Sequence, residues 1–289
     1  MRTIVQWLER LLRHGIVYPL LRLILHNPPV ALPLDIKKIR KVLILRYDKI
    51  GDVVVTTPVF RLIKKANPGI VLAVLASPSN AELILDNPYV DKVHVLHSNW
   101  ISLVREIVNA HEERYDLVLN FIFNRTTSGG ILANCIAPRR TKIGQGAEKY
   151  RFYFNVLLHL SRGSQHMAEV LGNIITEVFG IPVTQKDLAL ELFVDGRSGK
   201  QVEQYLSAKG LRSRSQKGKR GKGYVVVNLS ASDPIRRLSK QQGEHILRIL
   251  TEELSCNTVV IAAPADEQLR NELVRSVGGS RFQTAQCYI

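Results

Sequence analysis

The chain has 289 residues, of which 45% are hydrophobic and 22% charged, a composition that excludes a disordered protein and allows two modest domains. Its net charge of +15 predicts an anionic partner, such as a membrane surface, a phosphorylated substrate or a nucleic acid. Cys135, Cys256 and Cys287 are far apart and form no metal-ligand spacing, which argues against a disulfide framework or a zinc site and favours a reducing cytoplasm.

Residues 1–37 are predicted to form a basic amphipathic segment. Between Ile4 and Leu12 the apolar residues share one face of a helical wheel, and the polar, mostly basic residues gather on the other. The apolar stretch Ile16–Leu25 is shorter than the roughly 20 residues that span a bilayer, and no small-residue cleavage site of a signal peptide follows it. We expect this segment either to lie on anionic lipid or to pack on the folded part of the chain.

A buried strand followed by a turn and a helix opens the folded region. Val42–Leu45 is an uninterrupted run of β-branched residues and Leu, which is typical of a parallel strand covered on both faces. Lys49–Gly51 supplies a turn, and Asp52 stands at the mouth of the next helix. Thr57 is the expected N-cap of that helix, which Asn67–Gly69 ends.

Strands and helices alternate along the following residues. The expected strands are Ile70–Ala76, Lys92–Leu96, Tyr115–Phe121 and Thr141–Gly144, and the expected helices are Ala81–Leu85, Ile101–His111, Thr126–Ala137 and Gln165–Phe179. This alternation predicts a parallel sheet with right-handed crossovers, whose ligands lie beyond the carboxyl ends of the strands. Asp52 is expected at such an end.

The composition changes in the last third of the chain. Leu188–Val194 is expected to be extended and Gly199–Ala208 helical. In Arg212–Gly223 half of the residues are Lys or Arg, which predicts a solvated loop or a contact with acidic lipid or a glycolipid phosphate. Because no aromatic residues interleave with these charges, a nucleic-acid partner is not expected.

A second α/β domain is expected to follow this loop. Its predicted strand, helix and strand are Tyr224–Leu229, Lys240–Leu254 and Thr258–Ala262. We therefore divide the chain into an N-terminal segment at 1–37, an N-terminal Rossmann-like domain at 38–187 and a partial C-terminal one at 188–289.

Several short sequence blocks stand at the ends of the expected strands. They are VLILRYDKIGD at 42–52 with TTP at 56–58, NPYVDKV at 87–93, YDLV at 115–118, and NLSAS at 228–232 followed by Arg236 and Arg237. Together they resemble glycosyltransferase family 9, the heptosyltransferases of lipopolysaccharide core assembly, over roughly residues 40–275. The first block is the most specific part of the resemblance.

The resemblance implies an α/β, GT-B-like fold in which two Rossmann-like domains with parallel sheets face each other across a cleft. It also implies that heptose, or a related sugar, moves with inversion from an ADP-sugar to a lipopolysaccharide core or another lipid-linked saccharide. Such an enzyme would work at the cytoplasmic face of the bacterial inner membrane, as a peripheral protein on an anionic surface. The donor, ADP-heptose, is a substrate, and neither a cofactor nor a metal is expected.

An inverting transfer needs a base for the acceptor hydroxyl and groups that stabilise the departing diphosphate. Asp52 matches the proposed catalytic carboxylate of the family, although a carboxylate in that position can also simply stabilise a helix terminus. Asp48 is the fallback base or a turn residue. Gly51, Thr56 and His166 are further candidates on the acceptor side, and a lone His such as His166 can equally be a packed or surface residue.

The donor phosphates are expected to meet the second domain. Ser230 and Ser232 follow a strand end, where hydroxyl and amide groups can hold phosphate oxygens. Arg236 corresponds to a basic residue that faces the donor phosphates in the family, and Arg237 follows it. The family more often has Lys, a basic residue, Trp and Pro here, whereas this chain has RRLS at 236–239. The alternative for both arginines is a solvated basic turn.

The end of the sequence departs from the family pattern. Family members carry an Asp-Ser/Thr-Gly-x-x-His loop that holds the donor diphosphate, but residues 268–289 contain neither Asp nor His. Gly278–Ile289 shows no pattern of regular structure. We therefore expect a C-terminally truncated or frameshifted enzyme, whose second sheet has an unpaired edge and an uncovered face.

Three functions remain open at this point. The first is the glycosyltransferase, and the second is a non-catalytic fragment that binds membrane or acceptor only. The third is a basic nucleic-acid-binding protein, which would bind DNA or RNA with a strong dependence on salt.

Overall fold

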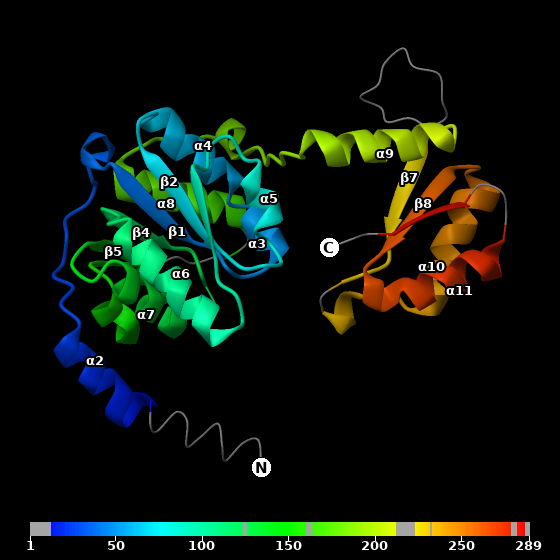
Figure 1. The fold of residues 1–289 in the computed structure, drawn as a ribbon. Coiled ribbons are helices and arrows are strands. Elements are labelled where there is room, and N and C mark those ends of the chain that lie inside the picture. The colour runs from blue at the N-terminus through cyan, green and yellow to red at the C-terminus, as the bar shows by residue number, and fades with distance from the viewer. Residues whose placement is uncertain are drawn as a thin grey trace. The chain divides into compact units, whose positions relative to one another are not determined.

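The computed structural model describes residues 13–123, 126–159, 163, 165–211, 223–231, 233–278 and 282–286. The chain divides into two compact units, of which the first ends at Phe193 and the second begins at Val194 (Figure 1). Each unit is an α/β structure with its own parallel sheet, which confirms the predicted fold class. The predicted amphipathic face between Ile4 and Leu12 and most of the basic stretch at 212–223 lie outside the described residues.

The first unit is built on a six-stranded sheet in the order β3-β2-β1-β4-β5-β6, and all neighbouring strands are parallel. Its strands are β1 (Lys41–Leu45), β2 (Val71–Ala76), β3 (Lys92–Val95), β4 (Leu117–Asn120), β5 (Thr141–Gln145) and β6 (Val156–Leu158). Its helices are α2 (Tyr18–Ile24), α3 (Ile50–Val54), α4 (Thr57–Ala66), α5 (Glu82–Leu85), α6 (Trp100–Glu112), α7 (Thr126–Ile136) and α8 (Met167–Phe179). The sequence prediction missed β6, a three-residue strand too short to show a period of its own.

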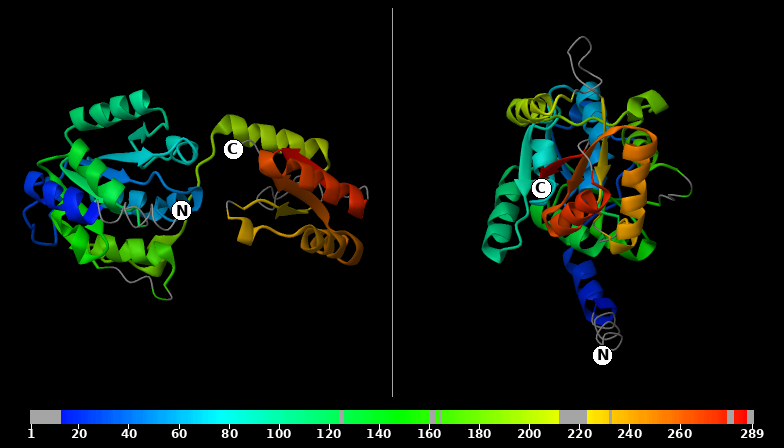
Figure 2. Two further views of the ribbon diagram at one scale, coloured as in Figure 1. Left: turned by 90° about the horizontal axis from the view of Figure 1, so that it is seen from below. Right: turned by 90° about the vertical axis from the view of Figure 1, so that its right-hand side faces the viewer.

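Strand β1 forms the centre of this unit because helices bury both of its faces. Val42 and Ile44 belong to a hydrophobic cluster that includes residues of α4 and α8. Leu43 and Leu45 belong to a second cluster with residues of α6 and α7. The left-hand view of Figure 2 shows helices on both sides of the sheet. The predicted parallel strand, covered on both faces, is confirmed.

The segment between β1 and β2 differs in detail from the prediction. A five-residue helix, α3, precedes α4, so Asp52 lies in the first turn of α3 and not at the mouth of the longer helix. The prediction that Thr57 caps the helix was wrong. Thr56 occupies the N-cap position without a side-chain cap bond, and the Thr57 hydroxyl donates instead to the main-chain oxygen of Val54 at 2.8 Å. The helix ends before Asn67, as predicted.

The second unit holds a three-stranded parallel sheet in the order β7-β8-β9. Its strands are β7 (Tyr224–Asn228), β8 (Asn257–Ala262) and β9 (Phe282–Gln286), and its helices are α9 (Gly196–Ala208), α10 (Lys240–Arg248) and α11 (Glu267–Val277). We predicted no continuation of the strand–helix pattern in Gly278–Ile289, but β9 lies within this stretch and pairs with β8 along its whole length. The helix expected to reach Leu254 ends at Arg248 and continues as a π-helical turn.

One edge of the second sheet is open among the described strands. Strand β7 pairs with β8 on one side and with no other described strand. Val225 and Val226 in this strand are exposed, whereas Val227 packs against residues of α10 and α11. The sheet therefore presents apolar side chains at its β7 edge.

The described part of the N-terminal segment begins with a π-helical turn at Arg13–Val17 and the short helix α2, and an irregular stretch leads from there to a 3-10 turn at Ile36–Lys38. Helix α2 packs on the first unit through Tyr18, which is buried, and through Leu21 and Leu25. Among the described residues, no helix has both the length and the apolar character needed to cross a bilayer.

A carboxylate that joins two strands gives this fold a testable dependence on pH. Glu113 accepts a hydrogen bond from Lys41 of β1 at 2.8 Å and another from Lys92 of β3. These two bonds lower the pKa of Glu113 from 4.5 to about 2. Because the folded state has the lower pKa, this stabilisation is complete above pH 4.5 and is lost as the pH falls toward 2.

We expect Glu113→Gln to lower the urea midpoint of unfolding at neutral pH. The difference from the wild type should narrow as the pH falls from 4.5 toward 2, because the wild-type carboxylate loses its charge over that interval. Urea unfolding followed by circular dichroism at several pH values measures both effects. Glu112→Gln, at an exposed neighbouring position, is the control. A difference that stays constant with pH would contradict the argument.

Candidate active site

The candidate site lies where the strand order of the first sheet reverses. The chain proceeds from β1 outward to β2 and β3, and then returns to the other side of β1 with β4, β5 and β6. In open parallel sheets, the crevice beyond the carboxyl ends of the strands at such a point is the usual place for a ligand. The residues that follow β1 and β4 meet at this point.

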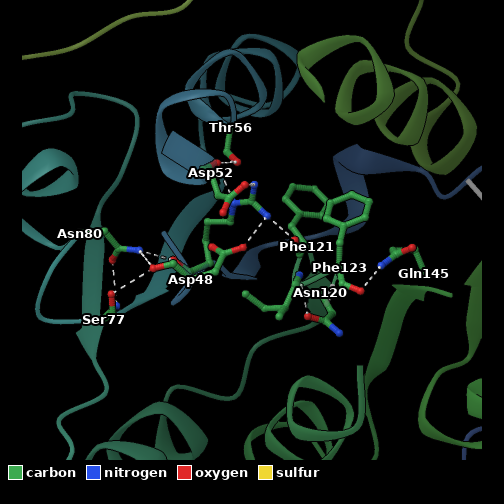
Figure 3. Close-up of polar contacts among 11 residues, drawn as sticks. Asp48, Asp52, Thr56, Ser77, Asn80, Asn120, Phe121, Phe123 and Gln145 are labelled. Atoms are coloured by element: carbon green, nitrogen blue, oxygen red, sulfur yellow. Dashed lines mark hydrogen bonds and ion pairs between the residues drawn. The ribbon is translucent and has the colours of Figure 1, made fainter. Parts of the chain in front are cut away.

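Arg46, the first residue after β1, has a fully buried side chain that contacts two carboxylates. Its Nη1 lies 3.2 Å from Oδ2 of Asp48, and its Nη2 lies 3.5 Å from Oδ1 of Asp52 (Figure 3). Its Nε donates to the main-chain oxygen of Asp52 at 2.8 Å, and Nη1 also donates to the main-chain oxygen of Phe121. The guanidinium therefore joins the ends of β1 and β4 to the start of α3.

Two opposing effects act on the charge of this arginine. Burial lowers the pKa of Arg46 from its ordinary value, whereas the negative charges of Asp48 and Asp52 raise it. An arginine remains protonated under such conditions, so the site contains one buried positive charge between two carboxylates.

Of the two carboxylates, Asp52 is the more accessible. Its side chain is 38% exposed, compared with 22% for Asp48. The hydroxyl of Thr56 donates to the main-chain oxygen of Asp52 at 2.7 Å, which fixes the turn of α3 that carries the carboxylate. Arg46 orients the Asp52 carboxylate, which is also partly exposed to solvent. A carboxylate in such a position can take a proton from a bound hydroxyl group.

Side chains after β2 hold the loop that carries Asp48. The amide nitrogen of Asn80 donates to the main-chain oxygens of Arg46 and Asp48, at 3.0 and 3.1 Å. The Oδ1 of Asn80 accepts from the main-chain nitrogen of Ser77 at 2.8 Å (Figure 3). Asn80 is fully buried, so these bonds form in a place that excludes competing water. The loop after β1 is therefore fixed from its β2 side.

The other side of the site is formed by residues at the ends of β4 and β5. Asn120 is buried, and its Oδ1 accepts from the main-chain nitrogen of Ile122 at 3.1 Å. The ring of Phe123 lies 6.0 Å from the guanidinium carbon of Arg46. Gln145, in the last position of β5, donates to the main-chain oxygen of Phe123 at 3.4 Å (Figure 3).

The structure places four of the five predicted acceptor-side residues in one short segment. Asp48, Gly51, Asp52 and Thr56 share the segment that follows β1. Thr56 is buried and holds the main chain of Asp52, and a Cβ added at Gly51 would meet only open space. His166 is the N-cap residue of α8, where its Nδ1 accepts from the main-chain nitrogen of Ala168 at 3.2 Å. This bond caps the helix, and the acceptor-side role of His166 stays a prediction.

Sequence reasoning missed three residues that shape the site: Arg46, Asn80 and Asn120. Each is a polar residue at or just beyond the end of a buried strand or in the turn that follows it. A polar residue in that position could have been recognised as part of a site, because a polar side chain buried at a strand end needs hydrogen-bond partners from neighbouring strands. The identity of those partners depends on the strand order, which the sequence does not state.

In the second unit the loops after β7 and β8 are tied to each other. The main-chain nitrogen of Ala263 donates to Oγ of Ser230 at 2.7 Å, so this hydroxyl joins the ends of the two strands. Arg237 contacts Asp266 at 3.2 Å and donates to the main-chain oxygen of Ala231 at 2.9 Å. Its charge is therefore already paired with a carboxylate of the segment that follows β8.

Two further residues were predicted to hold the donor phosphates. Arg236 is exposed, and within the described part of the chain its side chain makes no ion pair. Ser232 lies outside the described residues. In the ranges that the structure covers, no group of His, Cys, Asp and Glu side chains is arranged to hold a metal ion.

Comparison with solved structures confirms the fold. A glycosyltransferase family 9 protein of Veillonella parvula matches with a TM-score of 0.69 and 18% identity, over 88% of this chain and 70% of that one. The E. coli ADP-heptose lipopolysaccharide heptosyltransferase II matches with a TM-score of 0.62 and 16% identity, over 84% and 72% of the two chains. The E. coli heptosyltransferase WaaC, solved with ADP-2-deoxy-2-fluoro heptose, matches with a TM-score of 0.60 and 18% identity, over 85% and 76%.

One comparison of sequences gives a related result. A Haemophilus influenzae protein, whose name assigns it provisionally to the glycosyltransferases, is 23% identical over 251 residues, which cover 83% of this chain and 69% of that protein. No family model matches the sequence. Taken together, the similarities confirm the GT-B-like α/β fold and the resemblance to the heptosyltransferases of glycosyltransferase family 9.

Proposed function

We propose that this protein is an inverting glycosyltransferase that moves heptose, or a related sugar, from an ADP-sugar to a lipid-linked saccharide such as a lipopolysaccharide core. The main support is the pair of carboxylates on the buried Arg46, at the strand-order reversal of a heptosyltransferase-like fold. The E. coli relatives solved with ADP and with an ADP-sugar analogue support the choice of donor. The donor is a substrate, and the proposal includes no resident cofactor or metal.

In the proposed reaction Asp52 acts as the general base. Its carboxylate takes the proton of an acceptor hydroxyl while the hydroxyl oxygen forms a bond to the anomeric carbon of the donor sugar. The bond between that carbon and the diphosphate oxygen breaks, and ADP leaves with the bonding electrons. Arg46 holds the Asp52 carboxylate and its main chain, so the base keeps one orientation during the reaction.

The departing diphosphate needs positive charge or hydrogen-bond donors. We assign this role to Arg236, because its charge is not paired among the described residues, and assign to Arg237 the task of holding the loop through Asp266. Ser230 contributes to the same loop through its bond with Ala263. Ser232 remains a proposed phosphate contact.

The enzyme would work as a peripheral protein on the inner face of the bacterial inner membrane. The net charge of +15 suits an anionic surface and an acceptor that carries phosphate groups. Transfer of radiolabelled sugar from ADP-heptose to a lipid A core acceptor tests the proposal. The proposal would be contradicted if no sugar is transferred and if addition of ADP-heptose also leaves the thermal midpoint of unfolding unchanged.

We expect Arg236→Gln to raise the KM for the ADP-sugar by about tenfold or more, because a charge-assisted hydrogen bond to phosphate is lost. The thermal midpoint without donor should stay the same, since Arg236 is exposed and makes no ion pair with any described residue. Steady-state kinetics with varied donor measures the change. Arg248→Gln, an exposed arginine on α10 that pairs with Glu252, is the control and should leave KM unchanged. An unchanged KM in Arg236→Gln would remove Arg236 from the donor site.

A further inference from the structure

The short helix α2 is apolar on both of its sides, but only one side is covered. Tyr18 is buried, and Leu21 and Leu25 pack against an aromatic cluster that contains Tyr153 and Phe154. The prediction that the N-terminal segment packs on the folded part of the chain is therefore met by this side of the helix. Figure 1 and the right-hand view of Figure 2 show α2 projecting from the body of the first unit.

The opposite side of this segment exposes large apolar side chains. Leu20, Leu23 and Ile24 are 54%, 85% and 65% exposed, and Ile16, one turn earlier, is exposed as well. Their spacing of three and four residues places them along one side of a helix. We call Ile16, Leu20, Leu23 and Ile24 the outer face of α2. Single exposed apolar residues are common on protein surfaces. A group of them aligned on one side of a helix is instead typical of a surface that binds a partner or a membrane.

The charged residues of the segment that carries the outer face are basic. Residues 13–34 contain no Asp or Glu. The guanidinium of Arg22 lies over the ring of Phe152, 5.3 Å from its centre, and the ammonium of Lys149 lies over the ring of Tyr150 at 5.0 Å. Arg22 and Lys149 are exposed. Both cations lie over rings of the cluster on which the packed side of α2 rests, and the exposed Glu148 next to Lys149 pairs with Arg151. An apolar helix face on a segment whose charged residues are basic complements the acyl chains and anionic headgroups of a lipid surface.

Helix α2 contacts the first unit through a hydrogen bond and through packed aromatic rings. The hydroxyl of Tyr18 and Oγ1 of Thr127, near the start of α7, are 2.9 Å apart. The ring of Tyr18 makes an edge contact with the ring of Tyr150 and lies against that of Phe152, with centres 6.2 and 5.6 Å apart. Ser128, the next residue of α7, is 3.3 Å from the hydroxyl of Tyr47 in the candidate active site segment. The orientation of α2 is thus linked to the edge of the sheet that carries Asp52.

We propose that the outer face of α2 docks on an anionic bilayer, with the helix in the plane of the interface and Arg22 and Lys149 at the level of the headgroups. Seven residues are far too few to span the membrane, so the helix lies on it. Docking would bring the proposed glycosyltransferase close to its lipid-linked acceptor. Only this benefit rests on the proposed function; the binding to lipid does not. Binding to lipid can be measured without any turnover.

The test uses the full chain and sedimentation with sucrose-loaded vesicles of phosphatidylglycerol and phosphatidylethanolamine, or of phosphatidylcholine alone. The wild type should bind the anionic vesicles and not the zwitterionic ones. The double variant Leu20→Glu with Leu23→Glu should lose about tenfold or more of its affinity, because two apolar side chains leave the interface and two like charges approach the lipid. Arg22→Gln with Lys149→Gln should bind several-fold more weakly, with a smaller dependence on salt.

Leu85→Glu and Val202→Glu are matched controls, because both residues are exposed apolar positions on other helices. They should bind vesicles as the wild type does. Two outcomes would overturn the proposal. In the first, the Leu20/Leu23 variant binds as tightly as the wild type, which would place lipid binding elsewhere in the chain. In the second, that variant changes the oligomeric state in light scattering without any effect on vesicle binding, which would identify a second copy of the chain as the occupant.

Discussion

Asp52→Asn should reduce kcat for sugar transfer by about 10³-fold, within the range of about 10²–10⁴ for the loss of a general base. Asn has nearly the same shape as Asp but cannot take the proton of the acceptor hydroxyl. The fold should persist, because Arg46 still donates to the main-chain oxygen of residue 52 and still pairs with Asp48. Transfer of radiolabelled sugar at saturating substrate measures kcat, and circular dichroism verifies the fold.

Asp48→Asn is the matched control for this variant. Asp48 contacts the same guanidinium but is less exposed than Asp52, so we expect a much smaller loss of kcat, of about tenfold through the altered position of Arg46. If Asp48 is the base instead, the order of the two effects will be reversed. Unchanged transfer in Asp52→Asn with an intact fold would remove Asp52 from the mechanism.

The second large effect concerns stability. Arg46→Met should lower the free energy of unfolding by about 1–3 kcal/mol, because a buried acceptor loses its donor and two partly exposed carboxylates lose their shared cation. The variant leaves the main-chain oxygen of Phe121 without its donor and the carboxylates of Asp48 and Asp52 without their shared cation. Urea unfolding followed by circular dichroism measures the change.

Two further variants make this prediction specific. Arg139→Met alters an exposed arginine and should change the free energy of unfolding by less than about 0.5 kcal/mol. Arg46→Lys keeps the charge but lacks the planar fork that reaches both carboxylates and the Phe121 oxygen, so its stability should fall between that of the Arg46→Met variant and that of the wild type. If Arg46→Met is as stable as the wild type, the guanidinium does not hold the ends of β1 and β4 together.

The elements that sequence predicted best are those whose pattern is local. Val42–Leu45 is apolar throughout because helices cover both of its faces. The composition of this run was therefore enough to predict a strand buried on both faces. Strand β9, by contrast, contains mostly polar or small residues, and its extended conformation depends on pairing with β8. The cap at Thr57 failed for a different reason, since a local bond to the main-chain oxygen of Val54 takes the hydroxyl.

The same distinction applies to the site. Asp48 and Asp52 stand four positions apart in the chain, so their common neighbourhood followed from the predicted turn. Their shared partner, the buried side chain of Arg46, became evident only when the end of β4 was placed beside β1. The pairing of Arg237 with Asp266 likewise depends on β7 lying next to β8. The order of the strands determines which distant segments come into contact. The type of residue at a single position carries little information about that order.

The open edge of β7 has a consequence for how molecules of this protein behave toward one another. Among the described strands β7 pairs only with β8, so its other edge offers main-chain groups beside the exposed Val225 and Val226, and β7 carries no Lys or Pro to hinder pairing with another strand. At high concentration, association between copies would therefore begin in the second unit. Such association would grow with the concentration of the protein.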